Sequence, residues 1–141
     1  MESGMKVISG GQTGVDRAAL DAAMELGLET GGWCPRDRWA EDGRIPDHYK
    51  LWETRSADVH VRTQRNVETS SATLVLMRGS PMGGTRLTVE LARSMRRPIL
   101  AVDLLSARDP ERLIARWLDQ LAPSILNVAG PRERSAPGIS E

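Results

Sequence analysis

The sequence predicts an α/β fold, a doubly wound domain in which helices cover both faces of a mainly parallel sheet. Short apolar runs alternate along the chain with segments whose apolar residues recur at helical spacing. One run, residues 72–77, is apolar almost throughout, as expected for a strand that is buried on both faces. A length of 141 residues suits a single domain, which we expect to occupy residues 1–141.

The first half of the chain begins with a strand, a helix and a second strand. Residues 6–9 form an apolar run that stops at two glycines, which is typical of a strand entering a turn. A helix should follow and end at Gly27. Its apolar face should consist of Val15, Ala18, Ala19, Ala22, Ala23 and Leu26. Residues 30–33 indicate the second strand. Residues 34–48 are polar and rich in Pro, Gly and Asp, and a loop of this length is usually functional or forms an interface.

The second half continues the alternation of strands and helices. We expect strands over 51–53, 72–77, 98–102 and 125–128, and helices over 61–70, around 87–95 and after 109. The last helix should begin with Asp109 as its N-cap and Pro110 at its first position. Residues 130–141 form a C-terminal tail rich in Pro, Gly and Arg.

Composition excludes several classes of protein. The chain has 19 basic and 19 acidic residues, so bulk charge does not favour a nucleic-acid partner. No apolar run approaches the roughly 20 residues that a membrane span needs. The single cysteine, Cys34, excludes an internal disulfide and a multi-cysteine zinc site. His48 and His60 are not at metal-ligand spacing, so we expect no metal site. A cytoplasmic location follows as the expectation.

The first candidate site is the glycine-rich loop at residues 9–16, between a strand and a helix. Glycines let the backbone approach an anion closely, and the free amides at the helix start point toward it. Ser9 and Thr13 could add hydroxyl donors. Asp16 either contacts a ligand or only favours the helix start through the dipole. The loop lacks the G-x-G-x-x-G and P-loop patterns, and a simple tight turn remains the alternative.

Two further loops follow strands and should lie at the same sheet edge. Residues 79–85 contain a second glycine turn before a helix, so two such loops on neighbouring strands could grip one phosphate or pyrophosphate. In the third loop, Asn127 could bond a base, pterin or ribose, and Arg132 could pair with phosphate. The alternative for the third loop is a coil with a solvated arginine.

Other polar and aromatic residues have two interpretations. Arg62, Arg65 and Asn66 precede the central strand, where they contribute either to the site or to a solvated helix face. Three tryptophans around the long loop either pack or stack on a flat ring; these are Trp33, Trp39 and Trp52.

Five strings resemble one known family. They are SGGQTGVDRAALDAA (9–23), GWCPRDRWAEDGRIP (32–46), RTQRNVETSSATLVL (62–76), GGTRLTVELA (83–92) and NVAGPRERSAPGI (127–139). Together they resemble the molybdenum carrier family, which belongs to the SLOG group of Rossmann-like proteins. The resemblance implies a Rossmann-like sheet, a homodimer or homotetramer, and a phosphate-bearing ligand such as molybdenum cofactor or a nucleotide. Carried over by motif, the ligand loops are Ser9, Gly10, Gly11, Thr13 and Gly14, and Gly83, Gly84 and Thr85.

The same superfamily contains phosphoribohydrolases of the lonely-guy type, which cleave the N-glycosidic bond of nucleoside monophosphates. Their pattern is an arginine ahead of the central strand and then P-G-G-x-G-T-x-x-E. Arg62 fits the arginine, but Thr88 stands where the acid should be, and the next acid is Glu90. Five positions after Thr85, Glu90 should lie about 140° around the helix from it, away from the site.

Three functions therefore remain open. The first is a carrier that holds molybdenum cofactor or a related phosphorylated ligand without turnover. The second is a nucleotide N-glycosidase in which Arg62 positions the substrate and Glu90 catalyses. The third is a nucleotide-sensing module.

Overall fold

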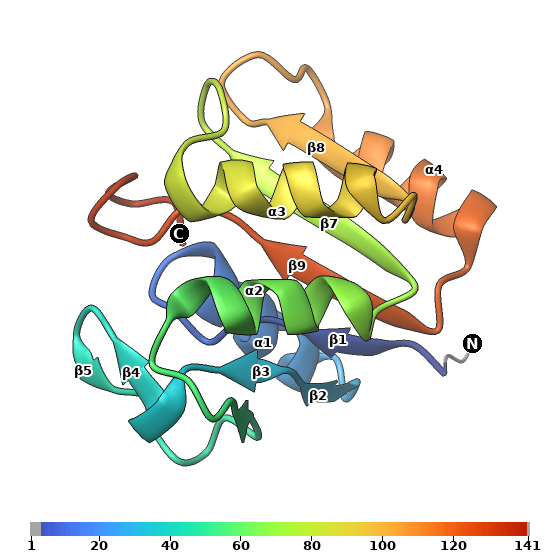
Figure 1. Cartoon of the computed structure of the whole chain (residues 1–141). Coiled ribbons are helices and arrows are strands. Elements are labelled where there is room, and N and C mark those ends of the chain that lie inside the picture. Colours follow the sequence, from blue (N-terminus) through green and yellow to red (C-terminus); the bar gives the residue numbers. More distant parts are fainter. Residues whose placement is uncertain (1–3, 141) are drawn as a thin grey trace.

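A five-stranded sheet forms the centre of the molecule, and its strands are all parallel (Figure 1). The computed structural model describes residues 4–140. In spatial order the strands are β2 (Glu29–Gly31), β1 (Lys6–Ile8), β9 (Ile125–Ala129), β7 (Ala72–Met77) and β8 (Ile99–Asp103). The predicted Rossmann-like α/β fold is confirmed. The last strand, β9, lies at the centre between β1 and β7.

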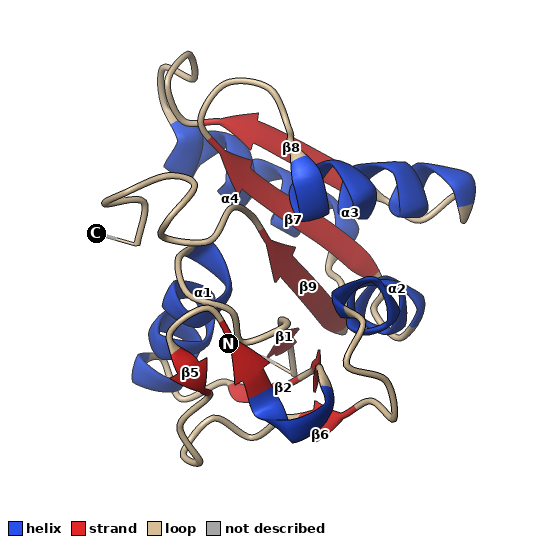
Figure 2. Ribbon diagram, turned by 60° about the vertical axis from the view of Figure 1, so that its left-hand side comes forward, coloured by secondary structure: helices blue, strands red, loops and turns tan. Residues whose placement is uncertain are grey.

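The helices form a layer on each face of the sheet. Side chains of α1 (Val15–Glu25) and α4 (Pro110–Leu121) share one hydrophobic core with inward residues of the strands. The helices α2 (Val59–Glu68) and α3 (Gly83–Ser94) pack against each other on the other face, as Figures 1 and 2 show. Both α2 and α3 begin at the edge of the sheet where the strands end, and they run side by side from there (Figure 1).

The two faces of the sheet differ in chemistry. Alternate residues of β7 and β9, such as Leu74 and Val128, enter the apolar core beneath α1 and α4. On the α2 and α3 face, Thr73 and Asn127 are paired at the same register and are both buried. The Asn127 Nδ2 donates to Thr73 Oγ1 at 3.4 Å. This second face therefore contains a buried polar pair beside apolar residues such as Val75.

The segment between β2 and α2 folds into small elements of its own. The strands β3 (Trp33–Cys34) and β6 (Trp52–Glu53) pair in parallel, and β4 (Trp39–Ala40) and β5 (Gly43–Arg44) form a hairpin after a 3-10 turn. Residues 34–48, expected to be a loop, thus contain short strands. They pack on α1 through a second core of Leu20, Cys34, Ala40, Ile45 and Tyr49.

Two helix faces differ from the expectation. On α1, Ala22 and Leu26 are exposed, whereas Asp16 and Leu20 are buried. Leu20 joins a core with residues of the β4–β5 segment, and Asp16 pairs with Arg62 of α2, so neighbouring segments cover a side of α1 that the apolar pattern does not mark. On α3 the buried stripe is Thr85, Thr88, Val89 and Ala92, and the expected markers Leu87, Leu91 and Met95 are only half-buried.

The burial of β8 and of the C-terminal tail also differs from the expectation. The strand β8 lies at an edge, and only Val102 of its residues is buried, so it is less enclosed than predicted. In the C-terminal tail, Ala136 and Ile139 enter the main core. Within residues 4–140, no helix combines the length and the apolar content that crossing a membrane requires.

Candidate functional site

The three glycine-bearing loops meet at the carboxyl edge of the sheet, where ligands of such folds bind. They follow β1, β9 and β7, which are consecutive in space. The first and second loops were expected on neighbouring strands, but β9 separates them. At a strand spacing of roughly 4.8 Å they start about 10 Å apart, with the third loop between them.

The first loop is held by its own side chains. Ser9 is fully buried, and its hydroxyl donates to the carbonyl of Asp16 at 2.9 Å. The same oxygen accepts from the amide of Gly11 at 3.3 Å. Gly11 has a φ of +74°, a conformation that favours glycine. Ser9 therefore shapes the loop, and its hydroxyl is already used inside the protein.

A buried ion pair joins this loop to α2. Arg62 Nη1 lies 3.1 Å from Asp16 Oδ2, and only 15% and 6% of the two side chains are exposed. The guanidinium lies directly on Gly10, where an added Cβ would be 1.7 Å from Nη1. Burial raises the pKa of the Asp16 carboxyl, and the positive charge of Arg62 opposes this rise. Within the described chain, the buried Nε of Arg62 has no hydrogen-bond partner.

The β4–β5 hairpin closes the outer side of the first loop. Its turn residue Glu41 accepts hydrogen bonds from the Thr13 hydroxyl and from the Arg134 amide, the latter at 3.1 Å. Arg132 Nε lies 3.5 Å from the other Glu41 oxygen. The next residue, Asp42, forms a bidentate pair with Arg17 at 2.6 and 2.8 Å, and this guanidinium lowers the Asp42 pKa.

The third loop covers the start of α1. The carbonyl of Pro131 accepts from the Val15 amide at 3.3 Å, and the Glu133 amide donates to Thr13 Oγ1 at 3.1 Å. Gly14 leaves no room for a side chain, because an added Cβ would be 2.4 Å from the Pro131 oxygen. Protein groups thus occupy the α1 side of the first loop, including Thr13 and Arg132, which the sequence assigned to a ligand.

The second loop is open. The N-cap of α3 is Met82, and no side chain caps the helix. Gly83 and Gly84 are exposed, and a Cβ added at either would meet no atom within 4 Å. Thr85 follows them and is 6% exposed. The Thr85 amide donates to the Met82 carbonyl at 3.1 Å, so the amides of Gly83 and Gly84 are the ones that an anion could approach at this exposed helix start.

An aspartate that the sequence analysis missed anchors this second loop. Asp103, at the end of β8, accepts from the amides of Gly79 at 2.8 Å and Leu105 at 3.0 Å. These bonds lower the pKa of its carboxyl. An acidic residue that directly follows a run of apolar strand residues is the signal that could have identified it.

Two predicted site residues lie away from the loops. Asn127 is inside β9, 2% exposed and bonded to Thr73. Glu90 lies on the exposed side of α3 and pairs with Arg86 at 3.2 Å, as its position along the helix predicts. The carboxylate that meets Arg62 is Asp16, so Arg62 and Glu90 are not paired in the structure.

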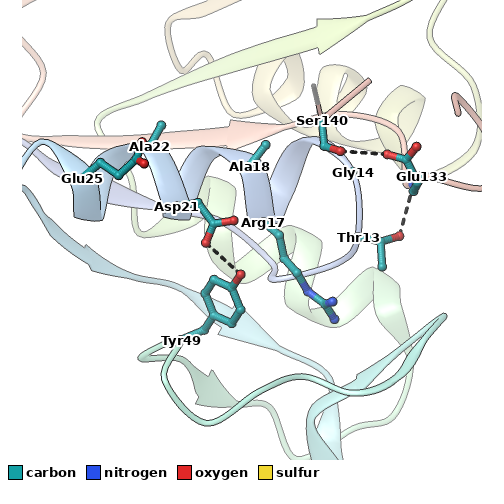
Figure 3. A pocket seen from close by; sticks show the side chains of 10 residues that line it. All are labelled: Thr13, Gly14, Arg17, Ala18, Asp21, Ala22, Glu25, Tyr49, Glu133 and Ser140. Atoms are coloured by element: carbon teal, nitrogen blue, oxygen red, sulfur yellow. Dashed lines mark hydrogen bonds between the residues drawn. The ribbon is translucent and has the colours of Figure 1, made fainter. Parts of the chain in front are cut away.

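A hollow of about 490 Å³ lies elsewhere along α1 (Figure 3). Its charged lining is mostly acidic, with Asp21, Glu25 and Glu133 around the single cation Arg17. Asp21 accepts from the Tyr49 hydroxyl at 2.8 Å (Figure 3). This charge disfavours a phosphate, so we place the candidate anion site at Arg62 and the start of α3. Residues 4–140 contain no cluster of three or more His, Cys, Asp and Glu side chains suited to a metal ion.

Comparisons with known proteins identify the family and the fold. A protein from Syntrophus aciditrophicus SB, provisionally named a molybdenum carrier, has a solved structure with a TM-score of 0.95 and 40% sequence identity. The match covers 99% of this chain and 90% of that chain. No curated protein matches the sequence. The model of the circularly permutated YpsA SLOG family matches residues 7–141. The resemblance inferred from the motifs is thereby confirmed, and the chain belongs to the circularly permutated YpsA SLOG family.

Proposed function

We propose that the protein binds a phosphorylated small molecule at the carboxyl edge of the sheet, between the starts of α2 and α3, and holds it without turnover. One observation carries the proposal. A largely buried arginine, Arg62, lies on Gly10 with a free Nε, beside a helix whose first amides are uncapped. A guanidinium and helix-start amides together favour a phosphate group.

Molybdenum cofactor is the ligand we favour, since the similar protein from Syntrophus carries the provisional name of a molybdenum carrier. This cofactor has a terminal phosphate and a flat pterin. The phosphate would be held by Arg62 and by the first turn of α3, Gly83 to Thr85. Gly10 and Gly11 would form the wall opposite that turn. Thr13, Asn127 and Arg132 keep their internal contacts in this arrangement.

Removal of the cation tests the phosphate site. Calorimetric titration with pyrophosphate and with AMP should show binding that Arg62→Ala weakens at least tenfold. Arg93→Ala is the matched control, because Arg93 is an exposed arginine in the last turn of α3 and should not affect affinity. Equal affinities of the Arg62→Ala variant and the parent protein would contradict the proposed site. Mass spectrometry of small molecules released from the purified protein would identify the ligand itself.

A second function is supported by the Asp16–Arg62 pair. A nucleotide N-glycosidase breaks the bond between C1′ and the base, adds water, and releases the base and ribose 5-phosphate. A buried carboxyl with a raised pKa is suited to exchanging a proton in such a site, and Asp16 is the carboxylate that pairs with Arg62 within residues 4–140. A nucleotide-sensing module would bind its nucleotide at the same site, beside Arg62 and the start of α3, without cleaving it.

Release of adenine from AMP separates the hydrolase from the carrier and the sensor. If the protein is a hydrolase, Asp16→Asn should abolish release, whereas Glu90→Gln should leave it unchanged. Circular dichroism of both variants checks that they fold. No adenine release by the parent protein, combined with AMP binding, would exclude this second function.

A further inference from the structure

We propose that Trp52, supported by Trp33 and Arg65, is a stacking platform for the planar heterocycle of the phosphorylated ligand. The inference rests on the proposed phosphate site and adds the chemical class of the rest of the ligand. That class is a fused, planar ring system joined to a phosphate, as in a purine nucleotide or a phosphorylated pterin.

The platform is a layered arrangement with one open side. The rings of Trp33 and Trp52 lie with centroids 6.4 Å apart and planes tilted by 40°. The Arg65 guanidinium lies over the Trp33 ring, 5.1 Å from its centroid. Trp52 is 69% exposed, so most of its surface is free to contact another ring.

Hydrogen bonds fix the backbone from which these two rings project. The buried Asn66 side chain accepts from the Trp33 amide at 2.8 Å and donates to the Trp33 carbonyl at 3.0 Å. The Trp52 amide donates to the Gly32 carbonyl at 2.8 Å. Fixing an exposed tryptophan in advance reduces the entropy lost when a ring stacks on it. The carboxamide of Asn66 thus positions the platform and does not itself reach the ligand.

The platform adjoins the proposed phosphate site. Gly32, one residue before Trp33, packs on the backbone of Ser9, and Leu51, one residue before Trp52, packs on Gly11. On α2, the arginine of the phosphate site and the arginine of the platform are three residues apart, which puts them on the same side of the helix. Their Cβ atoms are therefore roughly 5–6 Å apart. The phosphate site and the Arg65 end of the platform are therefore neighbours along α2.

Two ligands that differ only in the ring provide the test. AMP carries a purine and ribose 5-phosphate does not, so AMP should bind about tenfold more tightly, which is within the range measured for ring stacking. Trp52→Ala should remove that advantage and leave the affinity for ribose 5-phosphate unchanged. AMP should also quench tryptophan emission in the parent protein and less so in the variant.

Trp39→Ala is the matched control. Trp39 is 46% exposed on the β4–β5 hairpin and has no aromatic neighbour within the described chain, so its removal should change neither affinity. Equal binding of AMP by Trp52→Ala and the parent protein, or equal binding of AMP and ribose 5-phosphate by the parent protein, would overturn the platform while leaving the phosphate site intact. Absence of binding of either compound would instead refute the proposed function, and the platform with it.

Discussion

Tyr49 shows at the scale of one residue how the segment between β2 and α2 is fixed to the sheet domain. It is the only tyrosine in the sequence and is 7% exposed. Its hydroxyl donates to Asp21 of α1, and its ring lies 4.1 Å from that of His48 between centroids. Burial, followed by the hydrogen bond to Asp21, raises the pKa of Tyr49 to about 12. The neutral phenol is therefore favoured in the folded state.

This raised pKa predicts a loss of stability at alkaline pH. Between the ordinary value of 10 and about 12, the unfolded chain ionises its phenol while the folded chain keeps the proton. The contribution is present below pH 10 and disappears as pH rises through the folded pKa, at a cost of roughly 3 kcal/mol. Because there is one tyrosine, the absorbance of its phenolate gives the folded pKa directly.

Tyr49→Phe is the control for this titration. Denaturant unfolding of both proteins across the same pH range should show a steeper loss of stability in the parent protein. A phenolate midpoint near pH 10 in the folded protein would show that neither burial nor the hydrogen bond to Asp21 stabilises the neutral phenol.

The sequence was informative about which residues gather at the site and less so about what each contacts. The glycine loops lie at the predicted edge because strand ends and turn glycines are local signals. The hydroxyl of Thr13 and the guanidinium of Arg132 were assigned to a ligand, yet both contact Glu41. That contact depends on the placement of the β4–β5 hairpin, which no short-range pattern specifies. The pairing of Asp16 with Arg62 spans 46 residues and is equally invisible to spacing.

At the scale of elements, the two ends of α1 show what glycine does in different surroundings. Gly14 precedes the helix with a φ of +80°, and Gly27 follows it with a φ of +74°. A Cβ at Gly27 would meet no atom within 4 Å, whereas a Cβ at Gly14 would overlap the backbone of the third loop. Both positions have a positive φ, which is unfavourable for residues other than glycine. They differ in the space available for a side chain.

Gly27→Ala should therefore lower the free energy of unfolding by about 1–2 kcal/mol, which is the effect of a positive φ alone. Gly14→Ala should cost about 4 kcal/mol or more, because the third loop must also move away from the start of α1. Equilibrium unfolding in urea, with the slope checked for each variant, measures both. Similar costs at the two positions would mean that the third loop yields easily and does not hold α1.

Whether a segment forms a helix or a strand can be predicted, because the signals are local. Which of its residues are buried cannot be predicted in the same way, because burial depends on distant segments. The Asp109–Pro110 cap of α4 is confirmed, with the Asp109 side chain accepting from the Arg112 amide. The inward stripe of α3 begins with Thr85 and Thr88, which an apolar pattern cannot indicate. Similarly, the order of strands is a property of the whole chain, and β9 takes its central position only through pairing with distant strands.

At the scale of the whole molecule, one side of the sheet domain is incompletely covered. The edge strand β8 has one buried residue, and α4 has none. Between them lies a hollow of about 460 Å³ lined by Leu100, Asp109, Arg112, Leu113, Arg116, Trp117 and Gln120. Asp109 and Arg116 are two helical turns apart on one side, so an antiparallel second copy of α4 would set each opposite its counter-charge.

We therefore propose that a second copy of the chain covers this surface, which agrees with the homodimer or homotetramer that the motifs imply. Leu113 is 45% exposed there, and Leu113→Asp should lower the mass measured by analytical ultracentrifugation to that of a smaller assembly. Leu26→Asp, at a site 75% exposed beyond α1, should leave the mass unchanged. A monomeric parent protein, or a Leu113→Asp variant that assembles normally, would rule out this interface.

The closure of the first loop by the third has a consequence for the order of events during synthesis. Thr13 and Glu133, which bond to each other, are separated by 120 residues. The neighbour that β1 needs on its inner side, β9, also comes from the far end of the described chain. On the ribosome, β7, α3 and β8 can assemble before β9 pairs with β1 and before the third loop contacts the start of α1. The edge that we propose to bind phosphate is therefore complete only once β9 has entered the sheet between β1 and β7.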